Sequence, residues 1–407
     1  MEDCLEAAAR ERPDHAAVVA DDGSATYAEL DERVTRRARE LAGDGVRAGH
    51  AVPVALPPSL AFAELMHAAQ RIGAALMPLP PGTPLPRAPR RVGEGVHTVI
   101  GTSGTTGEPK VVELTAANHV ASAAASADAL GVEPGDRWLC PLPVHHVGGL
   151  GVLVRCAINR TTAVLHERFE AERVKRILEA GEVTLASLVP TMLARLRESG
   201  LRAGPNLRAI ALGGGPIPAG LLDWARDAEI PVVPVYGMTE TCSQIAAGSP
   251  GRPLVGVELA IGAYREILVR GPMVAAKEVG PDGWLHTGDL GWLDESGRLH
   301  VEGRLKELIV TGGENVAPLE VEQALLAHPA VADAGVTGVA DPQWGEAVVA
   351  FVVLSSPAAP GELRAWCRER LAKFKVPKSV HPVARLPRNA NGKLVRERLS
   401  APNRWKK

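Results

Sequence analysis

The stretch Gly101-Thr-Ser-Gly-Thr-Thr-Gly-Glu-Pro-Lys110 follows a short apolar run at residues 98–100 that is typical of a strand. Its glycines let the backbone bend so that several N–H groups can face one anion, and its hydroxyls and the Lys110 ammonium add further donors. This composition predicts a loop that holds phosphate. The pattern is not the G-x-x-x-x-G-K-[ST] sequence of a P-loop NTPase, so that class is disfavoured. A turn without a ligand is the plain alternative.

Strand-like and helical segments alternate on both sides of this loop. Helical spacing of apolar residues and short apolar runs follow one another in segments that include 27–41, 51–56, 61–72, 117–129, 162–165 and 207–212. The alternation predicts an α/β fold with largely parallel strands. After Gly251 the runs become short and turn-rich, which indicates a small β region. We therefore expect layered α/β subdomains plus a β region over residues 1–303, and a small α+β domain over 304–407.

The composition is that of a soluble globular protein. The 407 residues carry a formal net charge of -2 and are 46% hydrophobic, which excludes a largely disordered chain and a basic nucleic-acid coat. Five cysteines without a CxxC pair favour neither a disulfide framework nor a structural zinc site. With no export signal and no long apolar run, we expect a cytoplasmic protein without membrane insertion or nucleic-acid partner. A homo-oligomer is left open.

Six further motifs follow the loop in a fixed order and extend over most of the chain. They are Leu142-Pro-Val-His-His146, Gly213-Gly-Gly215, Tyr236-Gly-Met-Thr-Glu240, Thr287-Gly-Asp289, Gly303-Arg304 and Asn391-Gly-Lys393. Together with the loop they resemble the adenylate-forming superfamily of acyl- and aryl-CoA synthetases, peptide-synthetase adenylation domains and luciferases. The resemblance implies a ligase that uses ATP, Mg²⁺ and CoA to convert a small carboxylic acid into an acyl-AMP and then a thioester.

The same resemblance assigns a nucleotide site. Tyr236 could stack on adenine, and the Asp289 carboxylate offers two acceptor oxygens for the ribose hydroxyls. Glu240 would hold Mg²⁺, which takes one or two carboxylates plus phosphate oxygens. Each motif alone would be an ordinary turn. The implied nucleotide-binding residues are Thr102, Ser103, Gly104, Thr105, Thr106, Gly107, Lys110, Gly213, Gly214, Gly215, Tyr236, Gly237, Thr239, Asp289 and Arg304.

The catalytic residues implied by the family are Lys393, Glu240 and His146. A cation at Lys393 would stabilise the charge that develops between carboxylate and phosphate during adenylation. Lys306 matches the hinge about which the small domain turns, and Gly312 and Gly313 would then line the channel for CoA. Two departures from the family pattern are Glu307 after the hinge and Val111 after the loop.

Two segments are similar to the o-succinylbenzoate-CoA ligases of menaquinone biosynthesis, namely residues 143–155 and 236–245. This resemblance implies an acid-binding set of His146, Arg155 and Ser243. Arg155 lies in an apolar helical run, where a cation needs an anionic partner. That partner would be the second carboxylate of the substrate or, alternatively, an internal Asp or Glu. His146 could likewise be an ordinary core histidine.

Other functions stay open at this point. The chain could activate another aryl or acyl acid for CoA, or it could be a stand-alone adenylation domain that loads a carrier protein. A degenerate binding module is disfavoured because Lys110, Glu240, Asp289 and Lys393 are all present.

Overall fold

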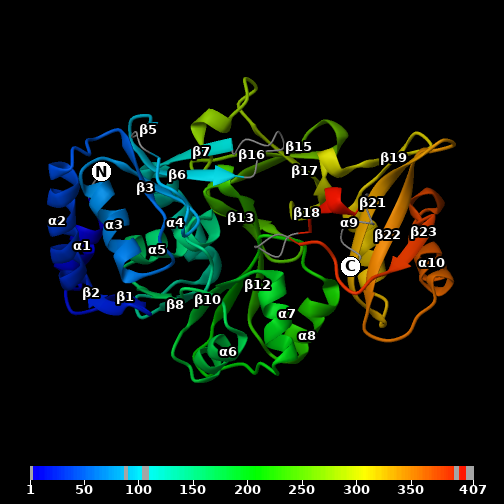
Figure 1. The fold of residues 1–407 in the computed structure, drawn as a ribbon, viewed down its shortest axis with the longest axis horizontal. Helices are drawn as coiled ribbons and strands as arrows, with labels where there is room; N and C mark the ends of the chain where they lie inside the picture. The colour runs from blue at the N-terminus through cyan, green and yellow to red at the C-terminus, as the bar shows by residue number, and fades with distance from the viewer. Residues whose placement is uncertain (1–2, 87–89, 103–109, 389–393, 400–407) are drawn as a thin grey trace. The chain divides into compact units, whose positions relative to one another are not determined.

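The computed structural model describes residues 3–86, 90–102, 110–388 and 394–399 (Figure 1). The chain divides into two compact units, of which the first contains Met1–Gly214, Ala228–Leu259 and Val269–Leu285, and the second Gly215–Asp227, Ala260–Leu268 and His286–Lys407. Both mix helices with strands, which confirms the predicted fold class. The boundary expected at Gly303-Arg304 stays a prediction.

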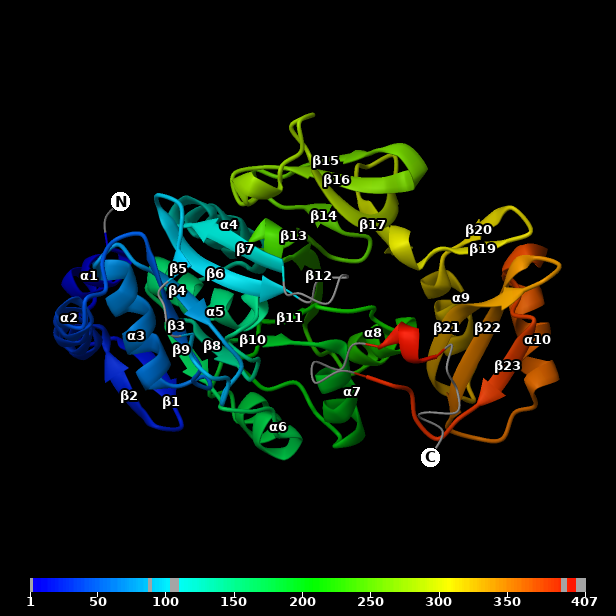
Figure 2. The same cartoon turned by 45° about the horizontal axis from the view of Figure 1, so that its top comes forward.

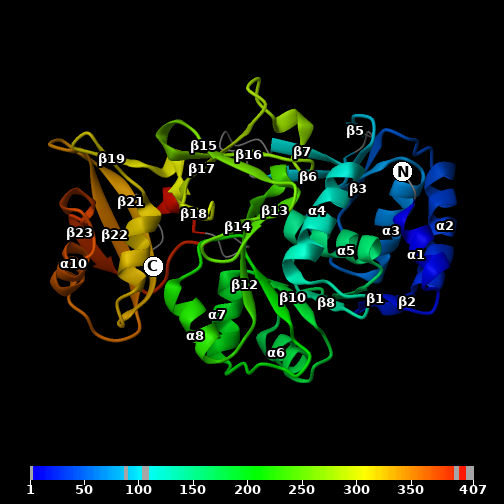
Figure 3. The same cartoon turned by 180° about the vertical axis from the view of Figure 1, so that it is seen from behind.

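The first unit contains a nine-stranded sheet with the order β14-β13-β12-β11-β10-β8-β9-β1-β2. The strands from β12 to β1 are parallel neighbours. Helices α4 and α5 lie on one side of the sheet and α6 and α7 on the other (Figures 1 and 3). Coverage of both faces explains why β9, β10 and β11 are buried throughout. The bounds are β1 Ala16–Ala20, β2 Gly23–Thr26, β8 Arg137–Cys140, β9 Thr162–Leu165, β10 Leu185–Leu188, β11 Ala209–Leu212, β12 Val232–Met238, β13 Ser243–Ala247, β14 Arg252–Pro253, α4 Ala116–Leu130, α5 Val147–Asn159, α6 Ala171–Glu179 and α7 Pro190–Glu198.

A second, five-stranded sheet of this unit has the order β5-β3-β4-β6-β7 and carries the predicted phosphate loop (Figure 2). Helix α3 connects the parallel strands β3 and β4. The parallel strands β4 and β6 are joined by residues 79–95, whose described part contains the short strand β5 and no helix. The bounds are β3 His50–Val54, β4 Ala75–Pro78, β5 Arg90–Arg91, β6 Val96–Thr102, β7 Lys110–Thr115, α1 Cys4–Glu11, α2 Tyr27–Gly43 and α3 Leu60–Arg71.

Residues 258–304 form a four-stranded sheet of order β15-β16-β17-β18, in agreement with the expected β region. The C-terminal part forms a sheet of order β20-β19-β22-β21, with β23 paired to β22 and with α9 and α10 packed on its core. The bounds are β15 Glu258–Ile261, β16 Glu266–Arg270, β17 Leu285–Leu293, β18 Leu299–Arg304, β19 Ile309–Thr311, β20 Glu314–Val316, β21 Val331–Asp341, β22 Gly345–Leu354, β23 Ser379–Pro382, α8 Ala219–Asp227, α9 Pro318–Leu326 and α10 Pro360–Arg368.

Helix α4 positions much of the site and has a well-defined start. Thr115 caps it by accepting a hydrogen bond from the Asn118 N–H, and the Asn118 side chain accepts one from the Thr115 N–H in return. This reciprocal cap satisfies donors that a helix start otherwise leaves open. Throughout the described residues, no helix combines the length and apolar character needed to cross a membrane.

Candidate active site

The phosphate loop connects two residues that are paired with each other. Thr102 at the end of β6 and Lys110 at the start of β7 are ladder partners, and the Thr102 hydroxyl donates to the Lys110 carbonyl oxygen at 3.3 Å. The pairing closes the base of the loop. The predicted binding residues between them, Ser103, Gly104, Thr105, Thr106 and Gly107, lie outside the described residues.

Lys110 is held between two carboxylates. Its ammonium group donates to Glu278 and lies 3.8 Å from Oε1 of Glu240. The hydrogen bond to Glu278 raises the pKa of Lys110, so this side chain stays cationic at neutral pH. The lysine predicted for phosphate and the glutamate predicted for Mg²⁺ are thus brought together. Glu278 was not predicted, because a single Glu in a turn-rich segment gives no sequence signal.

The carboxylates of Glu240 and Glu278 suit a hard cation such as Mg²⁺, which prefers oxygen ligands. Only Glu240 was predicted to hold it. No group of three or more His, Cys, Asp or Glu side chains that could hold a metal by itself occurs among the residues the structure describes. The donor set therefore fits an ion completed by substrate phosphates rather than one enclosed by protein.

The segment after β12 turns sharply and places several predicted residues close together. Tyr236 and Gly237 end β12, Thr239 and Glu240 form the 3-10 turn Thr239–Thr241, and Ser243 begins β13. A Cβ on Gly237 would lie 1.9 Å from the Ser243 carbonyl oxygen, so only glycine fits there. The turn also requires left-handed backbone at Cys242 and Ser243, with φ of 51° and 94°.

The three glycines that follow β11 have different structural roles. A Cβ on Gly213 would lie 2.7 Å from Cγ2 of Val235, so this residue permits the close approach of β11 to β12. Gly214 has a positive φ of 82°. Gly215 has open space around it, which is compatible with the predicted approach of a nucleotide. Gly213 thus has a packing role that the sequence did not reveal.

Arg155 is a buried cation without a carboxylate partner in the described part of the chain. The side chain lies on α5 and is 4% exposed. One guanidinium nitrogen donates to the Ser122 hydroxyl at 3.2 Å, the group lies 6.0 Å from the Trp138 ring centroid, and its Nε has no hydrogen-bond partner. Burial lowers the pKa of Arg155 from its ordinary value. The internal ion pair considered as an alternative is therefore not formed among these residues.

Ser122 on α4 connects Arg155 to the segment that carries Ser243. Its hydroxyl donates to the Cys242 carbonyl oxygen at 2.7 Å, and one turn later Ser126 accepts from the Gln244 amide at 2.6 Å. Two residues predicted to bind the acid are thereby linked through one serine. Neither Ser122 nor Ser126 was predicted, although their spacing of four residues indicates a shared helix face.

His146 occupies the start of the helix that carries Arg155. It is the N-cap residue of α5, and its ring lies 4.4 Å from that of His145 between centroids. Burial lowers the pKa of His145 to about 4, so that neighbour is neutral at pH 7. Nine residues separate His146 from Arg155, or roughly 13 Å along a helix. The two predicted acid-binding residues therefore lie about two and a half turns apart on α5.

The predicted ribose residues form a pair of their own. Asp289 on β17 and Arg304 on β18 are ladder partners, with Nε of Arg304 3.0 Å from Oδ1 of Asp289. Asp289 is buried, and its N–H donates to the Thr287 hydroxyl at 3.0 Å. Its carboxylate is thus fixed by its neighbours.

Lys306 is exposed within the 3-10 turn Leu305–Glu307 that follows β18. Gly312 and Gly313 form the turn between β19 and β20 with φ of 61° and 83°, which glycine adopts without strain. A Cβ on Gly312 would lie 2.8 Å from the Trp344 ring. The predicted CoA-binding glycines are therefore required by the turn itself.

Lys393 lies outside the described residues, but the chain is paired on both sides of it. Arg388 and Leu394 form a β-bridge, and the Val395 N–H donates to the Pro387 carbonyl oxygen at 2.8 Å. Arg396 donates to Val336 and forms ion pairs with Glu322 and with Glu307, the latter at 3.0 Å. These contacts fix both flanks of the segment to the core of the C-terminal part.

Comparison with known proteins gives a consistent picture. The family model of AMP-binding enzymes matches residues 5–100 and 86–276, and that of the AMP-binding enzyme C-terminal domain matches 320–393. The 2-succinylbenzoate--CoA ligase of Bacillus licheniformis is 46% identical over 339 residues, covering 75% of this chain and 71% of that protein. Its counterpart in Bacillus subtilis is 45% identical over 334 residues, covering 75% of this chain and 69% of that protein.

Solved structures agree with these relatives. The o-succinylbenzoate CoA synthetase (MenE) from Bacillus subtilis in complex with the acyl-adenylate OSB-AMP has a TM-score of 0.88 and 36% identity, covering 98% of each chain. The same enzyme with ATP and magnesium has a TM-score of 0.87 at 36% identity, covering 98% of this chain and 99% of that one. ATP-bound MatB from Rhodopseudomonas palustris has a TM-score of 0.88 at 25% identity, covering 100% of both.

Proposed function

This chain belongs to the AMP-binding enzyme family, and from that premise we propose that its described site activates o-succinylbenzoate and transfers it to CoA. The enzyme is an AMP-forming acid-thiol ligase that uses ATP, Mg²⁺ and CoA. The observation that carries the substrate assignment is Arg155, a buried guanidinium with no carboxylate partner among the described residues.

The substrate would supply the anionic partner that Arg155 lacks among the described residues. o-Succinylbenzoate has two carboxylates, and only one of them reacts with ATP. A buried cation is stable only when an anion and further hydrogen bonds satisfy it. The second carboxylate would accept from the free Nε of Arg155, while Ser122 keeps the guanidinium in place and holds the Ser243 segment beside it. His146 would contact the acid from the start of α5.

In the first half-reaction, a carboxylate oxygen attacks the α-phosphorus of ATP, the bond to the β-phosphate breaks, and pyrophosphate leaves. We assign the β- and γ-phosphates to the loop and Lys110, and the developing charge to Lys393, because fixed cations act most strongly where charge develops. Glu240 would hold Mg²⁺, which neutralises phosphate charge when bound. Tyr236, Thr239 and the glycines 213–215 would contact the adenine side, and Asp289 with Arg304 the ribose.

In the second half-reaction, the thiolate of CoA attacks the acyl carbonyl carbon and AMP leaves. We propose that residues 304–407 form a domain that turns about Lys306 against residues 1–303, so that Gly312 and Gly313 line the CoA channel. The exposed position of Lys306 in a short 3-10 turn supports a hinge, since such turns absorb backbone rotation. We also propose a cytoplasmic location and leave a homo-oligomer to be tested by sedimentation.

The deciding experiment is acid-dependent exchange of pyrophosphate into ATP across a panel of carboxylates. o-Succinylbenzoate should exceed benzoate, fatty acids and malonate. Thioester formation is then compared between free CoA and a phosphopantetheinyl carrier protein. Preference for a simple benzoate or a fatty acid would assign another aryl- or acyl-CoA ligase, and preference for the carrier protein would assign a loading domain.

A further inference from the structure

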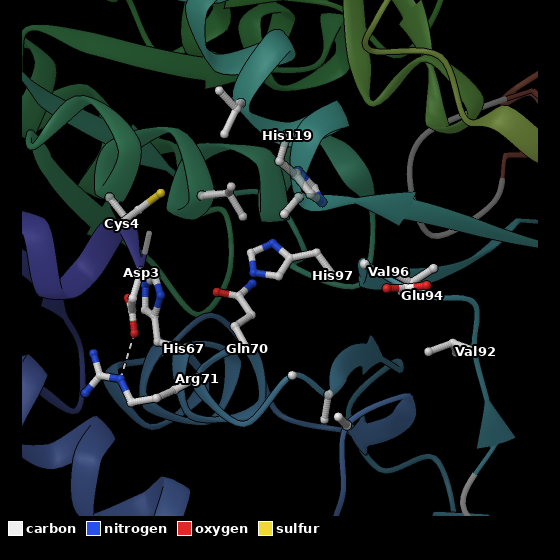
Figure 4. A pocket seen from close by; sticks show the side chains of 18 of the residues that line it. Asp3, Cys4, His67, Gln70, Arg71, Val92, Glu94, Val96, His97 and His119 are labelled. Carbon is white, nitrogen blue, oxygen red and sulfur yellow. Dashed lines mark hydrogen bonds and ion pairs between the residues drawn. The ribbon is translucent and has the colours of Figure 1, made fainter. Parts of the chain in front are cut away.

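A cavity of about 870 Å³ lies in the first unit, and its lining contains none of the residues predicted for the ligase site (Figure 4). Residues that precede β3, β4 and β6, among them Gly49, Ala74 and Gly95, line it, and so do parts of α1, α3, α4 and α5. The cavity therefore lies at the amino-terminal ends of parallel strands. The phosphate loop follows the opposite end of β6, roughly 17 Å from His97 at the usual rise per strand residue. Its volume is that of a small-molecule site.

Two buried polar atoms in this cavity have no hydrogen-bond partner. They are Nε2 of Gln70 and Nδ1 of His97, and both side chains point into the cavity (Figure 4). Buried donors and acceptors without a hydrogen-bond partner are destabilising. The pair is thus ready to bind one molecule that offers both an acceptor and a donor.

The charges around the cavity exclude the substrates of the ligase. Arg71 is neutralised by Asp3 at 2.7 Å and by Asp31 at 2.5 Å, so it has little capacity for a further anion. Burial lowers the pKa of both His67 and His97 to about 4, and these rings are neutral at pH 7. The exposed carboxylates that remain at the rim, Glu6 and Glu94, repel phosphates and carboxylates.

We propose that this cavity is a second, non-catalytic binding site for an uncharged planar molecule with a carboxamide or ring-amide edge. The amide nitrogen of Gln70 donates to the ligand carbonyl, and Nδ1 of His97 accepts from the ligand N–H. Apolar side chains of α4 and α5, namely Val120, Val154 and Ile158, offer contact surface for the flat faces.

The probe for this site is nicotinamide, titrated by calorimetry into the full-length protein that is already saturated with AMP and Mg²⁺. We expect saturable binding of one nicotinamide per chain. Nicotinate, its anionic analogue, should bind at least tenfold more weakly. Gln70→Met keeps the side-chain volume but removes the donor and should weaken nicotinamide about fivefold or more, as for one lost hydrogen bond. The matched control is Gln343→Met, at an exposed glutamine outside the cavity, which should bind like the parent.

A second variant, Ala157→Phe, fills the cavity wall and should abolish binding while thermal unfolding shows that the protein is folded. If it does not fold, Gln70→Met decides alone. A crystal soaked with nicotinamide should place its carbonyl oxygen within hydrogen-bond distance of Gln70 Nε2. Absence of saturable binding, equal affinity in Gln70→Met, or a soaked crystal with ordered water alone in the cavity would each overturn the proposal.

Discussion

Asp289 and Arg304 face each other across the β17–β18 ladder, with 3.0 Å between Oδ1 of the aspartate and Nε of the arginine. Both residues were predicted from separate motifs, fifteen positions apart, and the structure makes them one pair. Asp289 is buried while Arg304 is 37% exposed at its side chain. The arginine thus orients the carboxylate that is predicted to accept from the ribose hydroxyls.

Asp289→Asn should raise the KM for ATP about tenfold or more, because the ribose would lose hydrogen bonds to a charged acceptor. The KM for the acid should change little. Asp223→Asn is a suitable control, since Asp223 forms an exposed pair with Arg226 away from the motifs. Steady-state kinetics with both substrates varied measures the difference. An unchanged KM for ATP would exclude the ribose role.

Lys110→Met should lower kcat/KM for adenylation by about a hundredfold, as expected for loss of a cation at the reacting phosphates. The control is Lys277→Met, because the Lys277 side chain is 65% exposed and pairs at 2.7 Å with Glu113, which is not a predicted site residue. This control should stay within about twofold of the parent. Pyrophosphate release provides the readout, and equal effects of the two variants would contradict the assignment of Lys110.

Arg155→Met should lower kcat/KM for o-succinylbenzoate. The corresponding rise in activation free energy should be about 2 to 5 kcal/mol, the usual result of removing one partner of a desolvated charge pair. Since no described carboxylate pairs with Arg155, the variant leaves no internal anion exposed, and its unfolding temperature should not fall. A monocarboxylate analogue should be a poor substrate of the parent and insensitive to the change. Uniform loss of activity toward every acid, with lower stability, would indicate a structural role.

The free energy of unfolding should decrease as the pH falls from about 6.5 toward 4. Burial lowers the pKa of His67 and His97 to about 4 and that of His119 to about 3. Below the ordinary value of 6.5 the unfolded chain binds protons that the folded chain does not, so the stabilisation is complete above pH 6.5 and lost on acidification.

Urea unfolding between pH 7 and pH 4.5 measures the slope of the free energy of unfolding against pH. In His119→Gln the difference in bound protons between the unfolded and folded states should be smaller by about one. A slope that is the same in His119→Gln and the parent would mean that His119 is protonated in the folded state.

Lys306→Pro should spare adenylation and slow thioester formation about tenfold or more, because proline fixes φ at the proposed hinge. Lys306→Ala is the matched control, since it removes the same ammonium group and leaves the backbone free. Single-turnover assays with supplied acyl-AMP separate the two half-reactions. If Lys306→Pro forms thioester at the rate of Lys306→Ala, the hinge lies elsewhere.

The sequence predicted the helices and buried strands well. The helix expected at 117–129 is α4, Ala116–Leu130, and the strand expected at 207–212 contains β11, Ala209–Leu212. Both follow from local apolar periodicity, which needs no knowledge of distant contacts. Strand order and register could not be predicted in this way, because they depend on pairing between residues far apart in the chain.

The sequence predicted the motif residues of the site but not the residues that contact them. Lys110, Glu240 and Arg155 were expected, but Glu278 beside Lys110 and Ser122 beside Arg155 were not. Glu278 is brought to Lys110 from 168 positions along the chain, so no local pattern could reveal it. The left-handed backbone at Cys242 likewise has no sequence signal, since it is imposed by the turn.

The connector between β4 and β6, whose described part contains no helix, makes this enzyme a candidate scaffold for an inserted sensor domain. Gly82 in this connector is exposed, has a positive φ of 80° and has open space around its Cα. Exposed turns of this kind accept inserted domains because little native packing is disturbed. A fluorescent module inserted at Gly82 would be joined through β6 to the loop that is predicted to hold phosphate. Ligand-dependent strain on that strand would then become an optical signal, and the enzyme could report its own occupancy inside a living cell.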